Sequence, residues 1–363
     1  MGLLLGALGL ADTDRVFAEK SGQQQVYSTM QDYLRRISEA FAASTEFFVG
    51  QTTTNYKWRY YLPGGGYMQK TNFAPNARSH AIKNTGYWDV ALPIDAWETA
   101  FASDEVSMAY MTAGDLDRHF TSITAAYVNS QRYEILKTLF RNTNRTFVDP
   151  LQGSLTVVPL ANGDGTLYPA VIGSDTEADD THHLESGYAY TAISDTNNPL
   201  VTIKNELTEH FGITEGGENI VVVVNSRETP YLQALTDYVP VLDSFVVPGD
   251  QTMVIAGRPS LPASFRLVGR SNGVWIAEWD YMPAGYMVGR HMGFPAPLAK
   301  RVDPSDTGLG TGGLDLVAPR ESDHPFEAAF YRTRCGYGVV NRLNAVVMEL
   351  GTGGTYTVPT AYA

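Results

Sequence analysis

The chain has 363 residues, of which 44% are hydrophobic and 18% charged, and its formal net charge is -13. This length is sufficient for one large domain or two ordinary ones with a substantial core, and the hydrophobic content excludes wholesale disorder. The negative charge argues against general nucleic-acid binding, because most of the surface would repel a polyanion.

Cys335 is the only cysteine, so no internal disulfide can form, and the composition fits folding in a reducing cytoplasm. We expect Cys335 to be a packed small side chain. The N-terminal run MGLLLGALGLADTDR has no Lys or Arg before Arg15, which argues against a signal peptide. It is also too short and too glycine-rich to span a bilayer, so we expect an arm whose leucines are buried against another surface, and no membrane segment.

Residues 29–43 place Tyr33, Leu34, Ile37 and Phe41 at three- and four-residue spacing, which predicts a short amphipathic helix. The next stretch, residues 47–88, contains no Asp or Glu but carries five Lys or Arg. We call this stretch the basic arm.

Within the basic arm, Tyr56, Trp58 and Tyr60 alternate with Lys57 and Arg59, and the sequence PGGG at 63–66 is typical of a turn. This pattern predicts a hairpin with aromatic side chains on one face and cations on the other. Two legs of about 20 residues would reach about 60 Å if fully extended, so we expect the hairpin to project. A two-stranded ribbon is marginal alone in water, so a projecting one should lie on a partner.

Residues 115–142 give the strongest helix signal in the chain. Apolar residues recur at near-helical spacing, with Asp115 and Asp117 in the first turn and Lys137 and Arg141 in the last, as the helix macrodipole favours. At 1.5 Å per residue this helix is roughly 40 Å long, which suits a scaffold.

The middle of the chain predicts an α+β module. Short β runs occupy 145–191, Asn198 and Pro199 begin a helix that ends at Gly212, residues 219–224 (NIVVVV) form a buried strand, and a second helix begins near Thr229. Further strands are expected at 253–256, 264–268, 274–279 and 286–288, and a final strand within GYGVVNRLNAVVMEL returns to the core.

Three motifs resemble catalytic or ligand-binding patterns only in part. Gly269-Arg270-Ser271-Asn272-Gly273 fits G-x-S-x-G, but VWIAEW follows with strand character, so a hairpin turn is favoured over a nucleophile elbow. The stretch 179–185, with Asp179, Asp180, His182, His183 and Glu185, holds metal-ligand types without metal spacing, and a solvated acidic loop is favoured. The glycine-rich loop 308–313 is not followed by a helix that could present its N-terminus to a phosphate.

The aromatic and cationic residues of the basic arm could stack nucleic-acid bases. The alternative is an acidic protein surface, which this chain itself supplies in abundance. We therefore favour another copy of the same chain as the partner of the arm. When a projecting arm binds a neighbouring copy, the two surfaces in contact differ from one another. Such contacts close into rings or build extended lattices.

The order of these parts resembles the major capsid proteins of tailed bacteriophages, the Hong Kong 97-like family. The stretch DYMPAGYMVG at 280–289 is similar to a turn and strand late in the family's axial domain, and YRTRCGYGVVNRLNAVVMEL at 331–350 is similar to its closing segment. The resemblance covers essentially the whole chain, with the order of elements carrying more weight than any fixed residue. It implies an α+β fold with an N-terminal arm, an extended loop, a peripheral domain with a long spine helix, and an axial domain.

The resemblance assigns 1–45 to the N-terminal arm, 46–100 to the extended loop, 101–194 and 291–363 to the peripheral domain with its spine helix at 115–142, and 195–290 to the axial domain. It implies a non-enzymatic shell protein, assembled in the host cytoplasm as homo-pentamers and homo-hexamers around double-stranded DNA that is enclosed rather than recognised by sequence. Scaffolding, portal and decoration proteins are possible further partners.

No catalytic, cofactor or metal residues are expected, and no crosslinking Lys–Asn pair is assigned. Because Met1 lies close to the arm, we expect either no cleaved scaffolding segment or a separate scaffold. The alternatives are an encapsulin-like shell with a protein cargo, a β-rich hydrolase using Ser271 or the 179–185 stretch, and a tail-tube or decoration protein, which the long helix disfavours. The candidate intersubunit contacts are Lys57, Trp58, Arg59, Tyr60, Tyr61, Lys70 and Arg78.

Overall fold

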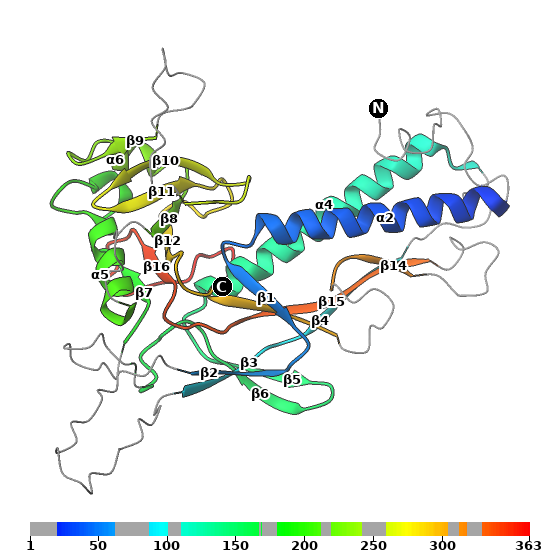
Figure 1. Cartoon of the computed structure of the whole chain (residues 1–363), viewed down its shortest axis with the longest axis horizontal. Helices are drawn as coiled ribbons and strands as arrows, with labels where there is room; N and C mark the ends of the chain where they lie inside the picture. The colour runs from blue at the N-terminus through cyan, green and yellow to red at the C-terminus, as the bar shows by residue number, and fades with distance from the viewer. Residues whose placement is uncertain are drawn as a thin grey trace, which may run out of the picture.

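The computed structural model describes residues 20–61, 87–100, 110–166, 168, 180–211, 219–241, 259–303, 312–317 and 329–363. The described chain has an elongated part, where two long helices lie over a sheet, and a second part built on a larger sheet (Figure 1). Several expected features lie outside the described residues: the leucine-rich N-terminal run, the turn at 63–66, the strand at 253–256 and most of the glycine-rich loop.

The longest helix, α4, is the one with the strongest sequence signal, and the structure confirms it. It begins after Thr112, whose hydroxyl accepts a hydrogen bond from the Asp115 backbone N–H at 3.3 Å, and Lys137 lies in its last turn. The helices of the described residues are α2 (Lys20–Ser44), α4 (Ala113–Phe140), α5 (Pro199–Phe211), α6 (Thr229–Gln233) and the short 3-10 helix η1 (Tyr190–Ala192).

Helix α2 confirms the predicted helix at 29–43 but begins earlier. Its buried side chains continue upstream at helical spacing, from Leu34 to Met30 and Val26. The acidic and basic side chains of α2 face away from this stripe, as in the i, i+3 pair of Asp32 and Arg35. The apolar stripe packs against α4 and β14.

A five-stranded sheet lies beneath α2 and α4 (Figure 1). Its centre is β15, which pairs antiparallel with β13, β14 and β4, while β1 adds in parallel to the free edge of β13. The strands are β1 (Val49–Thr53), β4 (Asp95–Ala100), β13 (Leu298–Val302), β14 (Asp315–Val317) and β15 (Phe330–Val339). Cys335 of β15 is fully buried, as predicted, and donates to Gln131 Oε1 of α4 at 3.1 Å.

A mixed seven-stranded sheet forms the second part, in the order β7-β16-β12-β8-β11-β10-β9. Its strands are β7 (His183–Glu185), β8 (Ile220–Val224), β9 (Val239–Pro240), β10 (Arg266–Ser271), β11 (Val274–Glu278), β12 (Tyr286–His291) and β16 (Val346–Glu349). The buried strand predicted at 219–224 is confirmed, and so are the predicted strands near 264, 274 and 286, although β10 and β12 run further than expected.

The central strands of this sheet are buried on both faces. In β8, Ile220, Val222 and Val224 point towards α5, while Val221 and Val223 point towards the aromatic side chains between the two sheets. Helix α5 begins as predicted, with the Leu200 N–H donating to Asn198 Oδ1 at 3.0 Å. A strand without a polar face is the expected consequence of such two-sided burial.

Two short hairpins complete the described chain. The first pairs β2 (Lys57–Tyr61) with β3 (Tyr87–Ala91), and the second pairs β5 (Arg145–Asp149) with β6 (Gly153–Val157). Ala91 of β3 packs against Leu155 and Val157 of β6, so the two hairpins support one another.

The predicted domain boundaries stay a prediction, but the sheets cross them. Strands β7 and β16 lie outside 195–290 in the chain, yet both belong to the seven-stranded sheet. No helix in the described ranges is long and apolar enough to cross a membrane.

Candidate functional site

The base of the basic arm is the β2–β3 hairpin, which has one face turned to the core and one to solvent. Trp58 lies opposite Val90, and Arg59 lies opposite Asp89. Val90 is fully buried, and Trp58 is partly buried against the same hydrophobic cluster. The alternation predicted from the sequence is therefore present, but the core of the chain itself contacts its apolar face.

Arg59 forms an ion pair within its own hairpin. Its Nε and Nη2 atoms donate to the two carboxylate oxygens of Asp89 at 2.6 and 2.7 Å, in a bidentate arrangement. The hydrogen bond and positive charge of Arg59 lower the pKa of Asp89 below its ordinary value. The acid-free stretch in the sequence ends at Trp88, one residue before the carboxylate that neutralises Arg59.

The remaining predicted contact residues lie either at the two ends of β2 or outside the described residues. Lys57 is exposed at the start of β2. Tyr60 and Tyr61 lie at its end, opposite Trp88 and Tyr87. Lys70 and Arg78 lie outside the described residues.

The tip of the β5–β6 hairpin exposes apolar side chains on a rigid support. Val148 is 72% and Leu151 is 79% exposed. Directly beside them, Asp149 is buried and accepts hydrogen bonds from the backbone N–H groups of Leu151 and Gln152 at 2.9 and 3.0 Å. Asp149 also pairs with the buried Arg301 at 2.6 Å, which fixes the tip to β13.

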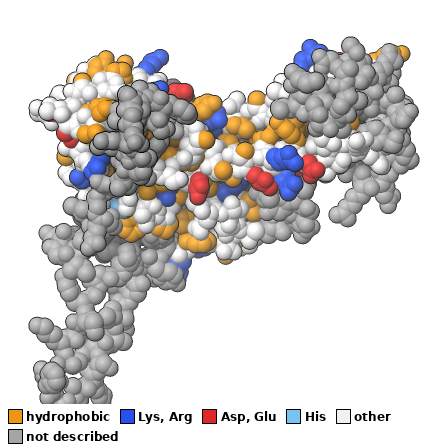
Figure 2. Space-filling view, turned by 45° about the horizontal axis from the view of Figure 1, so that its top comes forward, with side chains coloured by type: hydrophobic (Ala, Val, Ile, Leu, Met, Phe, Trp, Pro, Cys, Tyr) orange, Lys and Arg blue, Asp and Glu red, His pale blue; other side chains and the backbone are white. Residues whose placement is uncertain are grey.

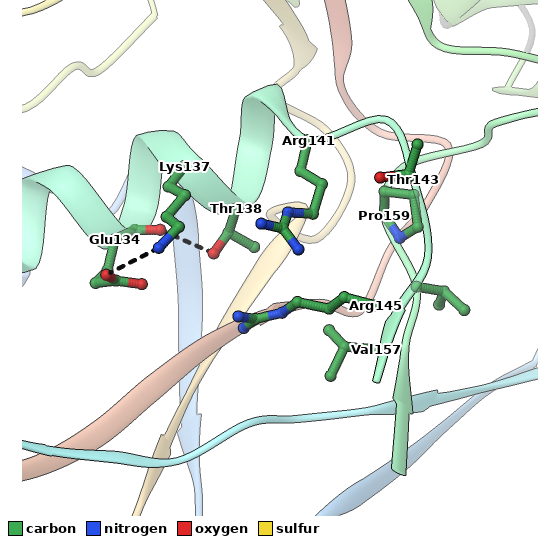
Figure 3. Close-up of a pocket in the computed structure, with 9 residues that line it drawn as sticks. Glu134, Lys137, Thr138, Arg141, Thr143, Arg145, Val157 and Pro159 are labelled. Carbon is green, nitrogen blue, oxygen red and sulfur yellow. Dashed lines mark hydrogen bonds and ion pairs between the residues drawn. The ribbon is translucent and has the colours of Figure 1, made fainter. Parts of the chain in front are cut away.

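A small notch at the C-terminal end of α4 gathers basic side chains, and we call it the basic notch. Lys137, Arg141 and Arg145 line it, and Figure 3 shows the two guanidinium groups directed into the same space. Glu134 pairs with Lys137 at 3.8 Å. Burial and the neighbouring charge of Arg141 lower the pKa of Arg145, while the charges of Asp95 and Glu134 act in the opposite direction.

A wider groove of about 420 Å³ lies between α4 and the five-stranded sheet. Trp97 of β4, Ile123 and Tyr127 of α4, and Tyr331 of β15 contribute its apolar lining, with Glu98 at its edge. It is a large concave apolar surface of the elongated part.

The prediction of a solvated acidic loop at 179–185 is wrong for its described residues. Asp180 is 5%, His182 0% and His183 5% exposed. His182 contacts the Ala345 carbonyl oxygen at 2.8 Å, and His183 contacts that of Leu139 at 3.0 Å. The segment lies at the sheet edge, where β7 pairs with β16. Its histidine side chains are therefore buried and contact backbone carbonyl groups of the fold.

The G-x-S-x-G stretch is a hairpin turn, as predicted. Ser271 of β10 pairs with Val274 of β11, and the two residues between them, Asn272 and Gly273, have φ values of 51° and 80°. Positive φ at both turn positions is the signature of a tight hairpin. The Ser271 hydroxyl donates to Asp237 Oδ1 at 2.7 Å.

Sequence reasoning missed the β5–β6 tip and the basic notch. The spacing of Lys137 and Arg141 was interpreted only as a complement to the helix dipole, while Arg145 lies on the following strand. The signal for the tip was Val148-Asp149-Pro150-Leu151, in which a turn-forming pair lies between two apolar residues.

The face of the molecule in Figure 2 carries acidic and basic side chains close to one another, with hydrophobic side chains between them. No single-sign patch dominates the described part of this face. A mixed surface of this kind favours protein contacts over a polyanion.

Solved structures with a similar fold come from phages and related particles. A structure from Mycobacterium phage Patience matches with a TM-score of 0.66 and 18% identity, covering 96% of this chain and 94% of that one. The capsid of an empty GTA particle gives 0.43 at 14% identity, covering 85% and 90%, and the mature capsid of bacteriophage PhiM1 gives 0.43 at 12%, covering 82% and 84%. Neither a protein-family model nor a curated protein matches the chain.

The match to the Mycobacterium phage Patience structure spans nearly the whole of both chains, so it tests the entire order of elements and not one module. The predicted α+β fold with its long helix is confirmed, while the extended part of the predicted hairpin lies outside the described residues. The chain shares its fold with the Mycobacterium phage Patience structure.

Proposed function

We propose that this protein is the major capsid protein of a tailed phage, a structural protein that assembles with copies of itself into a closed shell. The supporting observation is the fold likeness to the Mycobacterium phage Patience structure over 96% of the chain. The proposed shell consists of homo-pentamers and homo-hexamers and encloses double-stranded DNA. An acidic chain suits this role, because it does not adhere to its cargo.

The contacts between copies would come from elements that are anchored to the fold but have side chains exposed to solvent. The β2–β3 hairpin forms the base of the basic arm, and the β5–β6 tip holds Val148 and Leu151 in solvent. Exposed apolar side chains on a rigid element contribute binding energy without a large ordering cost. The basic notch and the groove along α4 are concave surfaces on which the exposed elements of a neighbouring copy would dock.

Lys57 is a better electrostatic probe of the arm than Arg59. Arg59 already pairs with Asp89 of its own hairpin, so reversing its charge would also disturb the hairpin. Lys57 is exposed at the start of β2. We therefore propose Lys57, together with Lys70 and Arg78 further along the arm, as the residues that orient a neighbouring acidic copy.

Electron microscopy and size-exclusion chromatography of the expressed chain test the proposal. We expect closed particles or ring-shaped oligomers, and Lys57→Glu should shift the population towards smaller species while the circular dichroism spectrum stays unchanged. The matched control is Arg36→Glu, which reverses another exposed basic side chain, on α2 and outside the arm. A chain that stays monomeric or dimeric at all concentrations would contradict a shell function.

The cargo is tested separately by the nucleic-acid content of particles purified from infected or producing cells. Double-stranded DNA inside the particles agrees with a phage capsid. Protein cargo without DNA would instead identify an encapsulin-like compartment with the same fold.

A further inference from the structure

Four side chains with metal-binding groups converge beside α5. Asp180 and His182 lie two residues apart in the segment just before β7, and Glu206 and Glu209 lie three residues apart on α5. A spacing of three on a helix brings both glutamate side chains to one side of α5. One ligand atom from each of the four lies within 4.8 Å of all the others.

The cluster is largely removed from solvent. Asp180 is 5% and His182 0% exposed, and the two glutamates are half-buried. Three carboxylates held this close repel one another, and a bound divalent cation would offset that repulsion.

The orientation of His182 is set from outside the cluster. Its Nδ1 lies 2.8 Å from the Ala345 carbonyl oxygen, which can only accept a hydrogen bond, so Nδ1 carries the hydrogen. The other ring nitrogen, Nε2, is thereby directed at the carboxylates and lies 3.1 Å from Asp180 Oδ2. A backbone carbonyl that fixes one imidazole nitrogen while the other binds a cation is the usual arrangement of metal-bound histidine.

We propose that Asp180, His182, Glu206 and Glu209 form a binding site for one divalent transition-metal cation. One imidazole nitrogen and three carboxylate oxygens suit Zn²⁺ or Mn²⁺, whereas Mg²⁺ and Ca²⁺ prefer oxygen ligands alone. The sequence contains the two halves as D-x-H at 180–182 and E-x-x-E at 206–209, but only the fold brings them together.

The cation would join two elements of the seven-stranded sheet region. The segment of His182 is fixed to β16, where the Val347 N–H donates to the His182 carbonyl oxygen at 2.8 Å. Helix α5 packs over β12 and β16. A cation bound by both would stabilise the folded state by mass action, because the unfolded chain does not hold the four ligands together.

The test uses the full-length, untagged chain, stripped with EDTA and dialysed. Isothermal titration with ZnCl₂, MnCl₂ and MgCl₂ should give one equivalent of Zn²⁺ or Mn²⁺ per chain and weaker binding of Mg²⁺. The added transition metal should also raise the unfolding temperature. Substitution with Co²⁺ provides a second readout, since bound Co²⁺ gives visible absorption bands that depend on its ligands.

The informative variant is the double substitution Glu206→Gln and Glu209→Gln, which keeps side-chain size on a half-buried helix face. We expect it to weaken Zn²⁺ binding by about 100-fold or more, given that outer-shell losses alone cost 10–100-fold, and to abolish the metal-dependent rise in unfolding temperature. The matched control is Glu39→Gln on α2, which should bind like the parent chain.

Two results would overturn the site. One is the absence of stoichiometric Zn²⁺ or Mn²⁺ binding by the folded parent chain. The other is a double variant, folded by circular dichroism, that binds the metal as tightly as the parent. Either result would mean that Asp180, His182, Glu206 and Glu209 do not form a metal site.

Discussion

The seven-stranded sheet and the two hairpins are built from opposite kinds of strand. In β8 all five residues are buried, with neighbours on both faces of the sheet. In β5 and β6 most residues are exposed or half-buried, and the tip turns Val148 and Leu151 into solvent. The residues of the central strand are buried within the chain, whereas the β5–β6 hairpin leaves apolar side chains exposed to solvent.

This difference separates the residues that make the fold from those available to a partner. Substitutions in the sheet should act on folding, and substitutions on the exposed faces of the hairpins should leave folding intact. The exception is Asp149, which lies in a hairpin but is bound to the buried Arg301 of the five-stranded sheet. Five predictions test this division, from the largest expected effect to the smallest.

Val222→Asp should prevent folding. Val222 is fully buried in a cluster of apolar side chains between α5 and the sheet, so a carboxylate placed there would be desolvated. We expect a loss of more than about 4 kcal/mol in the free energy of unfolding, seen as an insoluble chain or a lost circular dichroism signal. Thr156→Asp on the exposed face of β6 is the control, and equal damage from both would abolish the distinction between sheet and hairpin.

Asp149→Ala should cost roughly 3–5 kcal/mol in the free energy of unfolding, because it leaves the buried Arg301 without its carboxylate. Urea unfolding measures the loss. Asp32→Ala, which removes one partner of an exposed pair on α2, should cost less than about 1 kcal/mol. Equal costs would mean that the tip is not anchored by this pair.

The same pair predicts an acid dependence. Burial raises the pKa of Asp149, but hydrogen bonds from the Leu151 N–H and from Arg301 outweigh it, so the pKa lies below its ordinary value. A carboxyl group with a lowered pKa in the folded state stabilises the protein above its unfolded-state pKa of about 3.9. This stabilisation is lost as the pH falls through the folded-state pKa, so the difference between the parent chain and Asp149→Ala should shrink in urea titrations below about pH 4.

Gly289→Val tests how closely α5 approaches the sheet. A Cβ atom added at Gly289 of β12 would overlap the Cγ2 methyl group of Ile203 on α5, and a β-branched side chain on a packed helix cannot easily move aside. Overpacking of this kind costs about 1–3 kcal/mol, measurable by thermal unfolding. Gly353→Val, where the surroundings are open, should leave the unfolding temperature nearly unchanged.

The Arg59–Asp89 pair should contribute least to folding. Both side chains are substantially exposed, at 46% and 35%, so a double-mutant cycle with Arg59→Ala and Asp89→Ala should give a coupling energy of about 0–1 kcal/mol. A coupling well above this range would show that the base of the arm is stabilised like the core. The cycle is measured by urea unfolding under conditions where the chain does not assemble.

The sequence predicts the regular elements of this fold well where one physical signal dominates. The long helix α4 combines an apolar stripe with matching end charges, and β8 is an unbroken run of β-branched residues. The order of elements also predicts the fold that the chain shares with the Mycobacterium phage Patience structure. The upstream extension of α2 was missed, because its N-terminal half is rich in Gln and Ser, and only the packing of Val26 and Met30 reveals its buried face.

Local patterns could not predict contacts between distant segments. The basic character of the arm is clear in the sequence, but the partner of Arg59 lies 30 residues away and follows the acid-free stretch. The 179–185 stretch looks solvent-exposed from its composition, yet its histidines bond to carbonyl groups of Leu139 and Ala345. Burial of this kind depends on which strands become neighbours, and no short window of sequence contains that information.

The five-stranded sheet joins the two ends of the chain. Strand β1 pairs with β13, β4 pairs with β15, and the Tyr27 hydroxyl of α2 donates to the Leu316 carbonyl oxygen at 2.8 Å. During synthesis on the ribosome, β1 and β4 lack their partner strands until β13 and β15 emerge. A prematurely terminated polypeptide therefore lacks the sheet that supports the base of the arm.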